Sequence, residues 1–494
     1  MSEMKTYQMY INGEWVDSVS GEYFNSYNPA TGEAWCQVAK GTESDVDHAV
    51  QAAHAAFNNP EWSEMTYTER GKLVHKLGSL IAQNIDELAK YETMDNGKLL
   101  REMKGQLTYL PEFFYYYAGL ADKIHGQTLP MDKKDIFAFT TREPLGVVAA
   151  ITPWNSPLYL TTLKLAPALV AGNTIVIKPS EMTSASMLEL MKYVEEAGFP
   201  KGVVNVVTGF GQPVGDSLTK HPLVRRIAFT GGSESARHVV RNSAENFAQV
   251  SLELGGKSPN IVFEDADPDN AAMGIIAGIF GASGQSCVAG SRALLHVDIY
   301  DEVMEKLKER TKTIQIGDPL HEATEMGPLA TEAQLKRVKE YVSIGEEEGG
   351  KVLLGGKSPE HLSKGWYFEP TIIELSDSQA RIAQEEIFGP VLSVIPFRNE
   401  AEAIELANST EYALATGIWT KDVARAHRVS KAVRAGIVWV NTYRSVSPIA
   451  PIGGSGLSGH GRESGFDAIY EYTQTKAVWI NTSTEPMPDP FILR

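Results

Sequence analysis

Hydrophobic and polar residues follow a helical spacing through much of the chain before Gly146. From Ser44 to Phe57 apolar side chains recur every three or four residues, which predicts an amphipathic helix. Thr66 followed by Glu69 is typical of the capping box that opens a helix. Near the N-terminus, Asn12-Gly13 lies between apolar and aromatic residues, and both residue types tolerate the positive φ of a tight hairpin. We interpret these elements as scaffold and assign no chemistry to them.

From about residue 146 the pattern changes to short β-branched runs that alternate with amphipathic stretches. The first series predicts strands at residues 147–152, 174–178, 203–207, 225–230 and 259–263, with helices at residues 161–171, 185–197, 213–220 and 233–247. A second series, from residue 271 to residue 441, begins with a helix at 271–282, a strand at 293–297 and a helix from 301. This alternation predicts two α/β domains, each with a doubly wound parallel sheet. Ligands of such sheets bind beyond the carboxyl ends of the strands, so the loops there are the places to search.

Composition and charge narrow the classes of function. The chain has 494 residues, 45 basic and 62 acidic, and its net charge of −17 disfavours nucleic acid and anionic membrane surfaces as partners. Its apolar stretches fall short of the roughly 18–20 residues that span a bilayer, and its first residues lack the pattern of a secretory signal. Two cysteines, Cys36 and Cys287, make no disulfide framework. We expect a cytoplasmic protein.

Two of the loops contain residues suited to binding a nucleotide. Gly231 and Gly232 lie where a predicted strand meets a predicted helix, and the free backbone N–H groups of a helix start favour a phosphate. The alternative is a plain glycine turn. Lys178 ends another strand and Glu181 follows it, so the pair offers a donor and an acceptor for ribose hydroxyls. The alternative there is an ordinary solvated ion pair.

Two further loops contain residues suited to catalysis. Glu253 lies in an apolar run before two glycines, where burial raises the pKa of a carboxyl toward that of a general base working near neutral pH. The alternative is a glutamate that points outward from an edge strand. Cys287 lies in a loop of small residues after an apolar helix, and a thiolate there is a nucleophile. The alternative is inert packing, as for most free cysteines.

Taken together and in this order, the loops resemble those of the aldehyde dehydrogenase superfamily. The motifs are Ile151-Thr152-Pro153-Trp154-Asn155, Lys178-Pro179-Ser180-Glu181, Phe229-Thr230-Gly231, Glu253-Leu254-Gly255-Gly256-Lys257, Gly284-Gln285-Ser286-Cys287 and Glu385-Glu386-Ile387-Phe388-Gly389-Pro390. The resemblance extends over nearly the whole chain. It implies two Rossmann-like domains and a small β arm: an NAD-binding domain at 1–123 and 145–254, a catalytic domain at 255–458, and an oligomerisation arm at 124–144 and 459–494. It also implies a homodimer or homotetramer.

The resemblance further implies the oxidation of an aldehyde to a carboxylic acid with NAD. Cys287 would attack the aldehyde carbon to give a thiohemiacetal, and the side-chain amide of Asn155 with the backbone N–H of Cys287 would stabilise its oxyanion. Loss of hydride would leave a thioester, and Glu253 would activate the water that hydrolyses it. Lys164 matches a family lysine near the site and takes a secondary role.

Residues implied to contact the cofactor come from several of the motifs. They are Trp154, Lys178, Glu181, Gly211, Gly231, Gly232, Ser233, Glu386 and Phe388. The carboxylate of Glu181 should repel the extra phosphate of NADP, so NAD is expected to be preferred over NADP. No metal site is expected.

The predicted substrate tunnel departs from the common family pattern. Its candidate residues are Ser156, Leu160, Ser286, Arg444, Val446 and Ile452. Ser156 stands where Phe is frequent, and fewer aromatic residues predict a wider tunnel. Arg444 adds a positive charge, which favours a polar or carboxylate-bearing aldehyde such as a semialdehyde. The alternative is that Arg444 pairs with a local acid and does not contact the substrate.

Three other functions are weighed against hydrolytic oxidation. A coenzyme A-acylating semialdehyde dehydrogenase would share the scaffold and the cysteine but generally lacks the glutamate base, so Glu253 favours hydrolysis. A cofactor-independent thiol hydrolase would need a histidine beside Cys287, and the sequence has none nearby. A non-catalytic protein on the same scaffold would be expected to have lost Cys287, Asn155 or Glu253, and all three are present.

Overall fold

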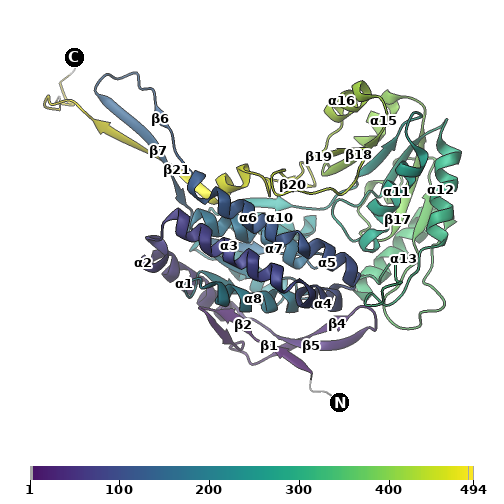
Figure 1. Cartoon of the computed structure of the whole chain (residues 1–494), viewed down its shortest axis with the longest axis horizontal. Coiled ribbons are helices and arrows are strands. Elements are labelled where there is room, and N and C mark those ends of the chain that lie inside the picture. Colours follow the sequence, from purple (N-terminus) through teal and green to yellow (C-terminus); the bar gives the residue numbers. More distant parts are fainter. Residues whose placement is uncertain (1–3, 488, 493–494) are drawn as a thin grey trace.

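The computed structural model describes residues 4–487 and 489–492 and has two α/β units, with a thin β arm projecting from one of them (Figure 1). The first unit contains an eight-stranded sheet with the order β20-β12-β11-β8-β9-β10-β2-β3. Its strands are β20 (Gly459–His460), β12 (Gln249–Glu253), β11 (Val224–Thr230), β8 (Val147–Ile151), β9 (Thr174–Lys178), β10 (Val204–Val206), β2 (Met9–Ile11) and β3 (Glu14–Val16). Neighbours from β12 through β10 are all parallel.

Helices cover both faces of this sheet. They are α1 (Glu43–Asn58), α2 (Pro60–Ser63), α3 (Tyr67–Gln83), α4 (Ile85–Asn96), α5 (Leu100–Thr108), α6 (Leu110–Leu120), α7 (Pro157–Ala171), α8 (Ala185–Ala197), α9 (Asp216–Lys220) and α10 (Ser233–Ser243). Strand β9 shows why both faces need this cover. Ile175 and Ile177 point to one face and pack into the core formed with α3, α6, α7 and α8. Val176 points to the other face and packs into the core formed with α1 and α9. A strand buried on both faces needs apolar residues at successive positions.

The second unit contains a seven-stranded sheet with the order β15-β16-β17-β14-β13-β18-β19. Its strands are β15 (Lys351–Leu354), β16 (Thr371–Glu374), β17 (Val391–Phe397), β14 (Arg292–His296), β13 (Pro259–Val262), β18 (Ala415–Trp419) and β19 (Ile437–Val440). Only the edge pair β15 and β16 is antiparallel. The helices of this unit are α11 (Pro268–Ile279), α12 (Tyr300–Lys312), α13 (Glu332–Glu347), α14 (Arg381–Gln384), α15 (Glu400–Ala407) and α16 (Val423–Ala432).

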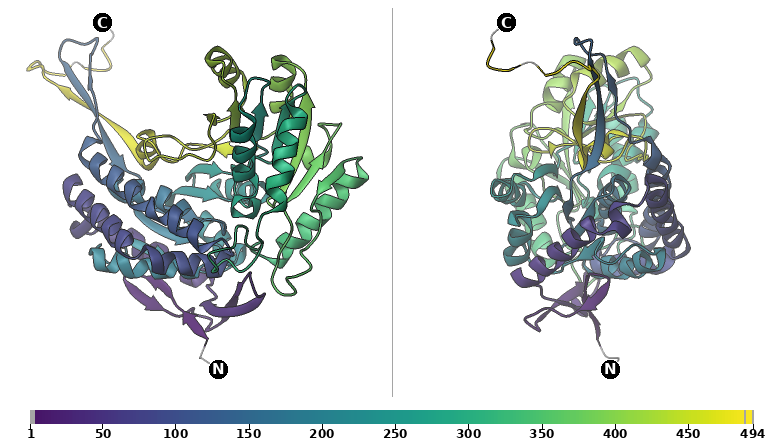
Figure 2. Two further views of the ribbon diagram at one scale, coloured as in Figure 1. Left: turned by 45° about the vertical axis from the view of Figure 1, so that its right-hand side comes forward. Right: turned by 90° about the vertical axis from the view of Figure 1, so that its left-hand side faces the viewer.

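Two small sheets lie outside these units. One, with the order β1-β5-β4, contains β1 (Lys5–Tyr7), β5 (Glu33–Ala39) and β4 (Tyr23–Asn28). The other is the arm, in which β7 (Ile136–Pro144) pairs with β21 (Thr473–Asn481) and with β6 (Thr128–Leu129) (Figure 2). Within the described residues, no helix is long and apolar enough to cross a membrane.

The predicted α/β fold with doubly wound parallel sheets is confirmed, and two predicted elements have the bounds that the structure shows: the strand at 174–178 and the helix at 185–197. The strand predicted at 259–263 as the last of the first series is instead β13 of the second sheet, because the chain crosses between the units after β12. Asn12 and Gly13 adopt positive φ angles of 54° and 70° in the predicted hairpin. The capping box at Thr66 is also formed. These elements depend on local sequence alone, which is why they were predictable.

Four predicted helices have different bounds in the structure. The helix predicted at 161–171 begins at Pro157, and the one predicted at 271–282 runs from Pro268 to Ile279. In both, a proline takes the first helical position, where its missing N–H is not needed. The helix predicted at 213–220 is an irregular turn followed by the short α9, and the one predicted at 233–247 ends at Ser243.

The carboxyl ends of both sheets lie near one cavity. Asn155 follows β8, Glu253 ends β12, and Trp439 lies on β19 of the second sheet. All three line this cavity together with Cys287. The fold therefore brings the ends of strands from both units to a single site.

Candidate active site

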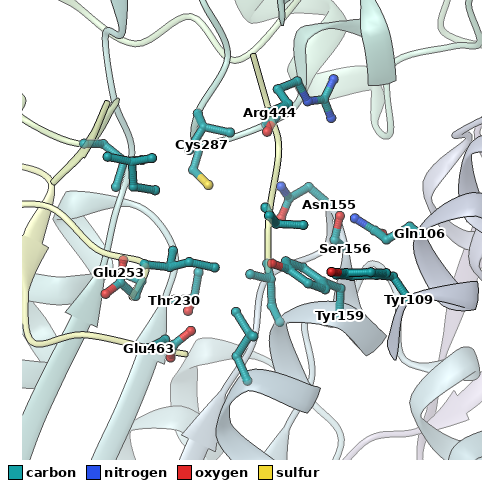
Figure 3. Close-up of a pocket in the computed structure, with 18 of the residues that line it drawn as sticks. Gln106, Tyr109, Asn155, Ser156, Tyr159, Thr230, Glu253, Cys287, Arg444 and Glu463 are labelled. Atoms are coloured by element: carbon teal, nitrogen blue, oxygen red, sulfur yellow. The ribbon is translucent and has the colours of Figure 1, made fainter. Parts of the chain in front are cut away.

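Cys287 lies in a loop whose backbone is held in an unusual shape. After α11, Ala282 and Ser283 both have positive φ angles, near 55° and 53°, which residues with a Cβ rarely adopt. The Ser283 hydroxyl donates a hydrogen bond to the Gly327 carbonyl at 2.8 Å, and the Ala330 N–H donates to the Gln285 side chain at 2.9 Å. These contacts hold the loop so that the sulfur of Cys287 points into the cavity (Figure 3).

The side-chain amide of Asn155 lies against the same loop. Asn155 is buried between β8 and α7, and its Nδ2 donates a hydrogen bond to the Gln285 carbonyl at 3.2 Å. This bond uses one of the two amide protons and fixes the orientation of the side chain. The second proton is then available to a group inside the cavity that Asn155 and Cys287 line.

The Glu253 carboxyl is buried at the carboxyl end of β12. Its Oε1 has no hydrogen-bond partner within the described part of the chain. Burial, with a smaller effect of the nearby Glu463 carboxylate, raises the pKa of Glu253 well above its ordinary range. An unpaired carboxyl of raised pKa that faces a cavity is suited to accepting a proton from a ligand or a water molecule.

Lys164 does not line the cavity but supports residues that do. It is 0% exposed on α7, its Nζ donates a hydrogen bond to the Thr230 hydroxyl at 2.6 Å, and it forms an ion pair with Glu463. Thr230 and Glu463 both line the cavity near Glu253 (Figure 3). The lysine thus compensates a buried carboxylate beside Glu253.

The thiol of Cys287 is protonated at neutral pH in this environment. Burial raises its pKa to about 12, and the carboxyls of Glu386 and Glu253 contribute to the shift, whereas the Val288 N–H opposes it. A nucleophilic attack by this sulfur therefore requires that its proton leave as the new bond forms.

The cavity around Cys287 has a volume of about 480 Å³. Every candidate substrate residue from the sequence lines it: Ser156, Leu160, Ser286, Arg444, Val446 and Ile452. Sequence reasoning missed Lys98, Gln106, Tyr109 and Tyr159, which come from α5, α7 and the turns beside them. Lys98, Gln106 and Tyr109 lie in a stretch for which no element was predicted, and no local motif distinguishes them.

The alternative reading of Arg444, in which it pairs with a local acid, is not what the structure shows. Its guanidinium donates a hydrogen bond to the Ala277 carbonyl at 3.2 Å, and no ion pair of Arg444 occurs among residues 4–487 and 489–492. The charge of Arg444 is therefore not neutralised by a neighbouring carboxylate.

A second cavity, also of about 480 Å³, lies at the carboxyl ends of β8, β9 and β11. Six predicted cofactor residues line it: Trp154, Lys178, Glu181, Gly211, Gly231 and Gly232. The Lys178 ammonium is buried, which lowers its pKa, and lies 3.8 Å from the Glu181 carboxylate. Ser233 is the exception, because it lines a separate hollow on the other side of α10, and Ser235 faces the cavity instead.

A third hollow, of about 170 Å³, connects the first two. It is lined by Glu386 and Phe388 together with Trp154, Gly231, Glu253 and Cys287. The Gly256 N–H donates a hydrogen bond to the Glu386 carboxyl at 3.2 Å, and burial raises the pKa of Glu386 to about 7. The Phe388 ring packs edge-to-face on Trp154 at 5.1 Å. The three hollows share residues and so form one path that ends at the sulfur.

The described residues contain no group of three or more His, Cys, Asp and Glu side chains arranged to hold a metal ion.

Comparisons with known proteins agree with this architecture. Residues 15–478 match the sequence model of the aldehyde dehydrogenase family. The chain is 52% identical to (Z)-2-((N-methylformamido)methylene)-5-hydroxybutyrolactone dehydrogenase of Acinetobacter baylyi, over 99% of this chain and 100% of that protein. It is 44% identical to betaine aldehyde dehydrogenase of Bacillus subtilis, over 96% and 97% of the two chains.

Solved structures give the same result. The crystal structure of PnpE from Pseudomonas sp. WBC-3 in complex with nicotinamide adenine dinucleotide is similar with a TM-score of 0.95, at 45% identity over 98% of this chain and 99% of that one. The resemblance inferred from the sequence motifs is confirmed. The chain belongs to the aldehyde dehydrogenase family.

Proposed function

We propose that Cys287 is the nucleophile with which this NAD-dependent aldehyde dehydrogenase oxidises its substrate to a carboxylic acid. The observation that carries the proposal is that a thiol, an amide donor and an unpaired carboxyl, from Cys287, Asn155 and Glu253, line one cavity. In this reaction the sulfur bonds to the aldehyde carbon and the thiol proton passes to a water molecule. The carbonyl oxygen becomes an oxyanion held by the Asn155 amide and the Cys287 backbone N–H.

NAD fits the two hollows that extend from the sulfur along the first sheet. A Cβ added to Gly211 or Gly232 would meet nothing within 4 Å, so the backbone there is open to a close ligand. Lys178 and Glu181 supply a donor and an acceptor for the adenosine ribose, and Glu386 supplies an acceptor for the nicotinamide ribose. When bound, the nicotinamide supplies the hydride acceptor of the oxidation.

Glu253 acts in the second half of the reaction, when the acyl group is bonded to Cys287. Its carboxylate takes a proton from water while the water oxygen bonds to the thioester carbon. The carbon–sulfur bond then breaks, the carboxylic acid is released, and the Cys287 thiolate regains a proton from Glu253. Lys164 contributes by holding Glu463 as an ion pair, which limits the negative charge that Glu253 meets when it ionises.

Glu181 is proposed to make NAD the preferred cofactor. The carboxylate lies in the ribose end of the second cavity, where the additional phosphate of NADP would add two like charges. We expect Glu181→Ser to lower the ratio of kcat/KM for NAD to kcat/KM for NADP by about 10-fold or more. Equal effects on both cofactors would contradict this role, and Glu195→Ser, on the neighbouring α8, is the matched control.

The substrate is proposed to be an aldehyde with a carboxylate or a similar polar group. Arg444 lines the cavity without an acidic partner among the described residues, which favours an anionic ligand. The name of the Acinetobacter relative describes a 5-hydroxybutyrolactone, and a hydroxylactone of this kind is the ring-closed form of an aldehyde acid.

The test of the proposed reaction is an aldehyde panel assayed with NAD by NADH absorbance. We expect turnover by the wild type, a loss of at least about 1,000-fold in Cys287→Ala, and retention of turnover in Cys36→Ala, which removes the other cysteine. Added coenzyme A should change neither the rate nor the product, and the formation of an acyl-coenzyme A would favour the acylating alternative. Full turnover by Cys287→Ala would refute the nucleophile.

The proposed organisation is an NAD-binding domain at 1–123 and 145–254, a catalytic domain at 255–458, and an arm at 124–144 and 459–494 through which the protein forms a homodimer or homotetramer. Strand β21 is at an edge of the arm sheet, where Trp479 and Ile480 expose 58% and 44% of their surface. Exposed apolar residues on an edge strand support coverage by a second subunit. A cytoplasmic location is supported by the two free cysteines.

A further inference from the structure

A buried lysine from the N-terminal scaffold reaches the active-site cavity. Lys98 follows α4 at a turn made by Gly97 and is only 4% exposed, yet it lines the same cavity as Cys287. Its Nζ donates a hydrogen bond to the Ser156 hydroxyl at 2.8 Å. Nothing in the proposed catalytic steps uses this ammonium group.

The Lys98 ammonium has no anionic partner. Among residues 4–487 and 489–492, its hydrogen-bond acceptor is the neutral Ser156 hydroxyl, and no carboxylate oxygen lies within 4.0 Å of Nζ. The two acids nearest in effect each accept one backbone hydrogen bond at 3.1 Å, Glu92 from the Leu158 N–H and Glu102 from the Ala282 N–H. Neither carboxylate forms an ion pair with Lys98 within 4.0 Å.

A buried cation without a counter-ion is costly, because it has lost its hydration and gained no ion pair in return. The effect is visible in Lys98, where burial, together with repulsion from Arg444, lowers the pKa to about 8, and the carboxyls of Glu102 and Glu92 offset the shift only in part. Arg444 lines the same cavity and likewise lacks an acidic partner among the described residues. Two cations that form no ion pair among the described residues therefore line a space of about 480 Å³.

An anionic ligand would supply the missing charge. The cavity also holds a hydrogen-bond donor that has no partner in the described chain, the Tyr159 hydroxyl, and Tyr159 lies beside Ser156 (Figure 3). A charge-assisted hydrogen bond from a desolvated ammonium to a carboxylate is among the stronger contacts available in a protein. The aldehyde itself is neutral, so the charge must come from another part of the substrate.

We propose that Lys98 is a specificity-determining residue whose ammonium binds a carboxylate at the far end of the substrate from the aldehyde. Ser156 is a positioning residue that orients the ammonium toward the cavity. The preferred substrates are then short aldehyde acids, in which one small chain places the aldehyde carbon at Cys287 and the carboxylate at Lys98 and Arg444. This inference rests on the proposed function and names its substrate class.

The kinetic test compares a matched pair of substrates, 4-oxobutanoate and butanal, which differ in the terminal carboxylate. In Lys98→Met we expect the ratio of kcat/KM for 4-oxobutanoate to kcat/KM for butanal to fall about 10- to 100-fold, through a rise in KM for the acid. Ser156→Ala should lower the ratio less, and Lys98→Arg should restore most of it. Lys104→Met removes an exposed lysine of α5 that forms an ion pair with Asp86, and its ratio should equal that of the wild type.

A binding test on the wild-type protein does not depend on turnover or on the folding of a variant. The rate at which iodoacetamide alkylates Cys287 is measured with 4-hydroxybutanoate or with butan-1-ol, neither of which is an aldehyde. We expect 4-hydroxybutanoate to protect the thiol at a concentration at least about 10-fold lower than butan-1-ol. Equal protection by the two compounds would overturn the proposal.

The two tests separate this inference from the function on which it rests. An unchanged substrate ratio in Lys98→Met, or an equal loss on both substrates, overturns the role of Lys98 even though Cys287 remains essential for oxidation. If instead the wild type oxidises neither aldehyde, or Cys287→Ala retains full activity, the proposed function fails.

Discussion

Burial controls the protonation of the groups that face the cavity. The pKa of Cys287 is raised to about 12 and that of Glu253 is raised well above its ordinary range, in both cases chiefly because the charged form loses hydration. Both shifts favour the uncharged forms, so the charge that develops during the reaction has to be met by hydrogen-bond donors such as the Asn155 amide, which lines the same cavity.

At Asn155 we expect a purely catalytic defect. Asn155→Ala removes a side-chain donor to the oxyanion but leaves the residues of the second cavity in place, so kcat should fall about 100- to 1,000-fold while the Kd for NAD stays within about 2-fold. Steady-state kinetics and isothermal titration calorimetry check the two values. A large loss of NAD affinity would show that the residue acts through the fold.

We expect the Glu253→Gln variant to be more stable than the wild type at pH 8 and to lose hydrolysis of the thioester. Because the pKa of Glu253 is higher in the folded protein than in the unfolded chain, the folded state binds a proton that the unfolded state releases. Stability therefore falls as pH rises from the unfolded pKa through the folded one. Glu253→Gln removes this titration, so its Tm should exceed that of the wild type at pH 8, and the difference should shrink toward pH 5.

The same Glu253→Gln variant should form NADH in a single burst and then stall, because the thioester is no longer hydrolysed. Differential scanning fluorimetry and stopped-flow absorbance measure the two effects. A Tm below that of the wild type at pH 8 would contradict the inferred protonation of Glu253.

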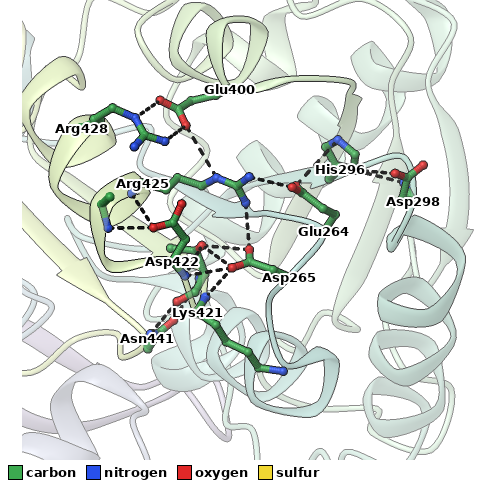
Figure 4. A network of polar contacts seen from close by, with 12 residues as sticks. Glu264, Asp265, His296, Asp298, Glu400, Lys421, Asp422, Arg425, Arg428 and Asn441 are labelled. Carbon is green, nitrogen blue, oxygen red and sulfur yellow. Dashed lines mark hydrogen bonds and ion pairs between the residues drawn. The ribbon is translucent and has the colours of Figure 1, made fainter.

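At the scale of elements, the second unit is held together by a polar network beyond the carboxyl ends of its strands (Figure 4). Asp265, just after β13, accepts hydrogen bonds from the Thr420 hydroxyl and the Lys421 N–H, each at 2.8 Å, and from the Asp422 N–H at 2.9 Å. Arg425 of α16 donates to Asp265 at 2.9 Å. One carboxylate thus joins the end of β13 to the β18–α16 turn.

We expect Asp265→Ala to destabilise the protein by about 1–3 kcal/mol, because several donors lose their acceptor at once. Partial burial opposes ionisation of Asp265, but its hydrogen bonds outweigh this effect and hold the pKa below the ordinary value. The contribution of Asp265 to stability is therefore present above its pKa in the unfolded chain and is lost as pH falls through its pKa in the folded protein. The difference in Tm between the wild type and Asp265→Ala should shrink in acid. Asp298→Ala, at a side chain that is 75% exposed, should leave Tm nearly unchanged.

At the scale of the whole molecule, residues of both α/β units line the site. The β arm projects from the first unit (Figure 2). The nine-residue pairing of β7 with β21 is continuous, with Phe137 opposite Ile480 and Ala138 opposite Trp479. Such a ribbon has too little core to be stable alone, and coverage by a second subunit would bury its apolar side chains.

Trp479→Glu should weaken the proposed oligomer. A tryptophan buried at an interface contributes at least about 2 kcal/mol to the free energy of association, which is roughly 30-fold in Kd. A carboxylate in its place would be buried without a partner and would weaken association further. Size-exclusion chromatography with light scattering should show a smaller assembly at micromolar concentration. Gln474→Glu places the same charge on the same exposed strand and serves as the control; an identical mass for all three proteins would rule out the arm as the interface.

Much of the fold was open to prediction because it depends on local pattern. The run of successive apolar residues along β9, the hairpin turn at Asn12 and the capping box at Thr66 are each decided by neighbouring residues. The site residues that follow strands, among them Asn155, Glu253 and Lys178, share this property, because parallel strands present their carboxyl ends at one edge. By itself, then, the sequence determined the family, the fold class and the residues that the strand ends bring to the cavities.

Tertiary structure alone decided which distant segments meet at the site. Lys98 and Gln106 come from helical scaffold about 180 residues before Cys287, and only long-range packing places them in its cavity. The turn of α10 likewise decides that Ser235 rather than Ser233 faces the second cavity. The raised pKa of Glu253 and the lowered pKa of Lys98 are likewise properties of the folded chain alone. Both shifts are caused chiefly by burial, which depends on what surrounds a group in space rather than on its neighbours in sequence.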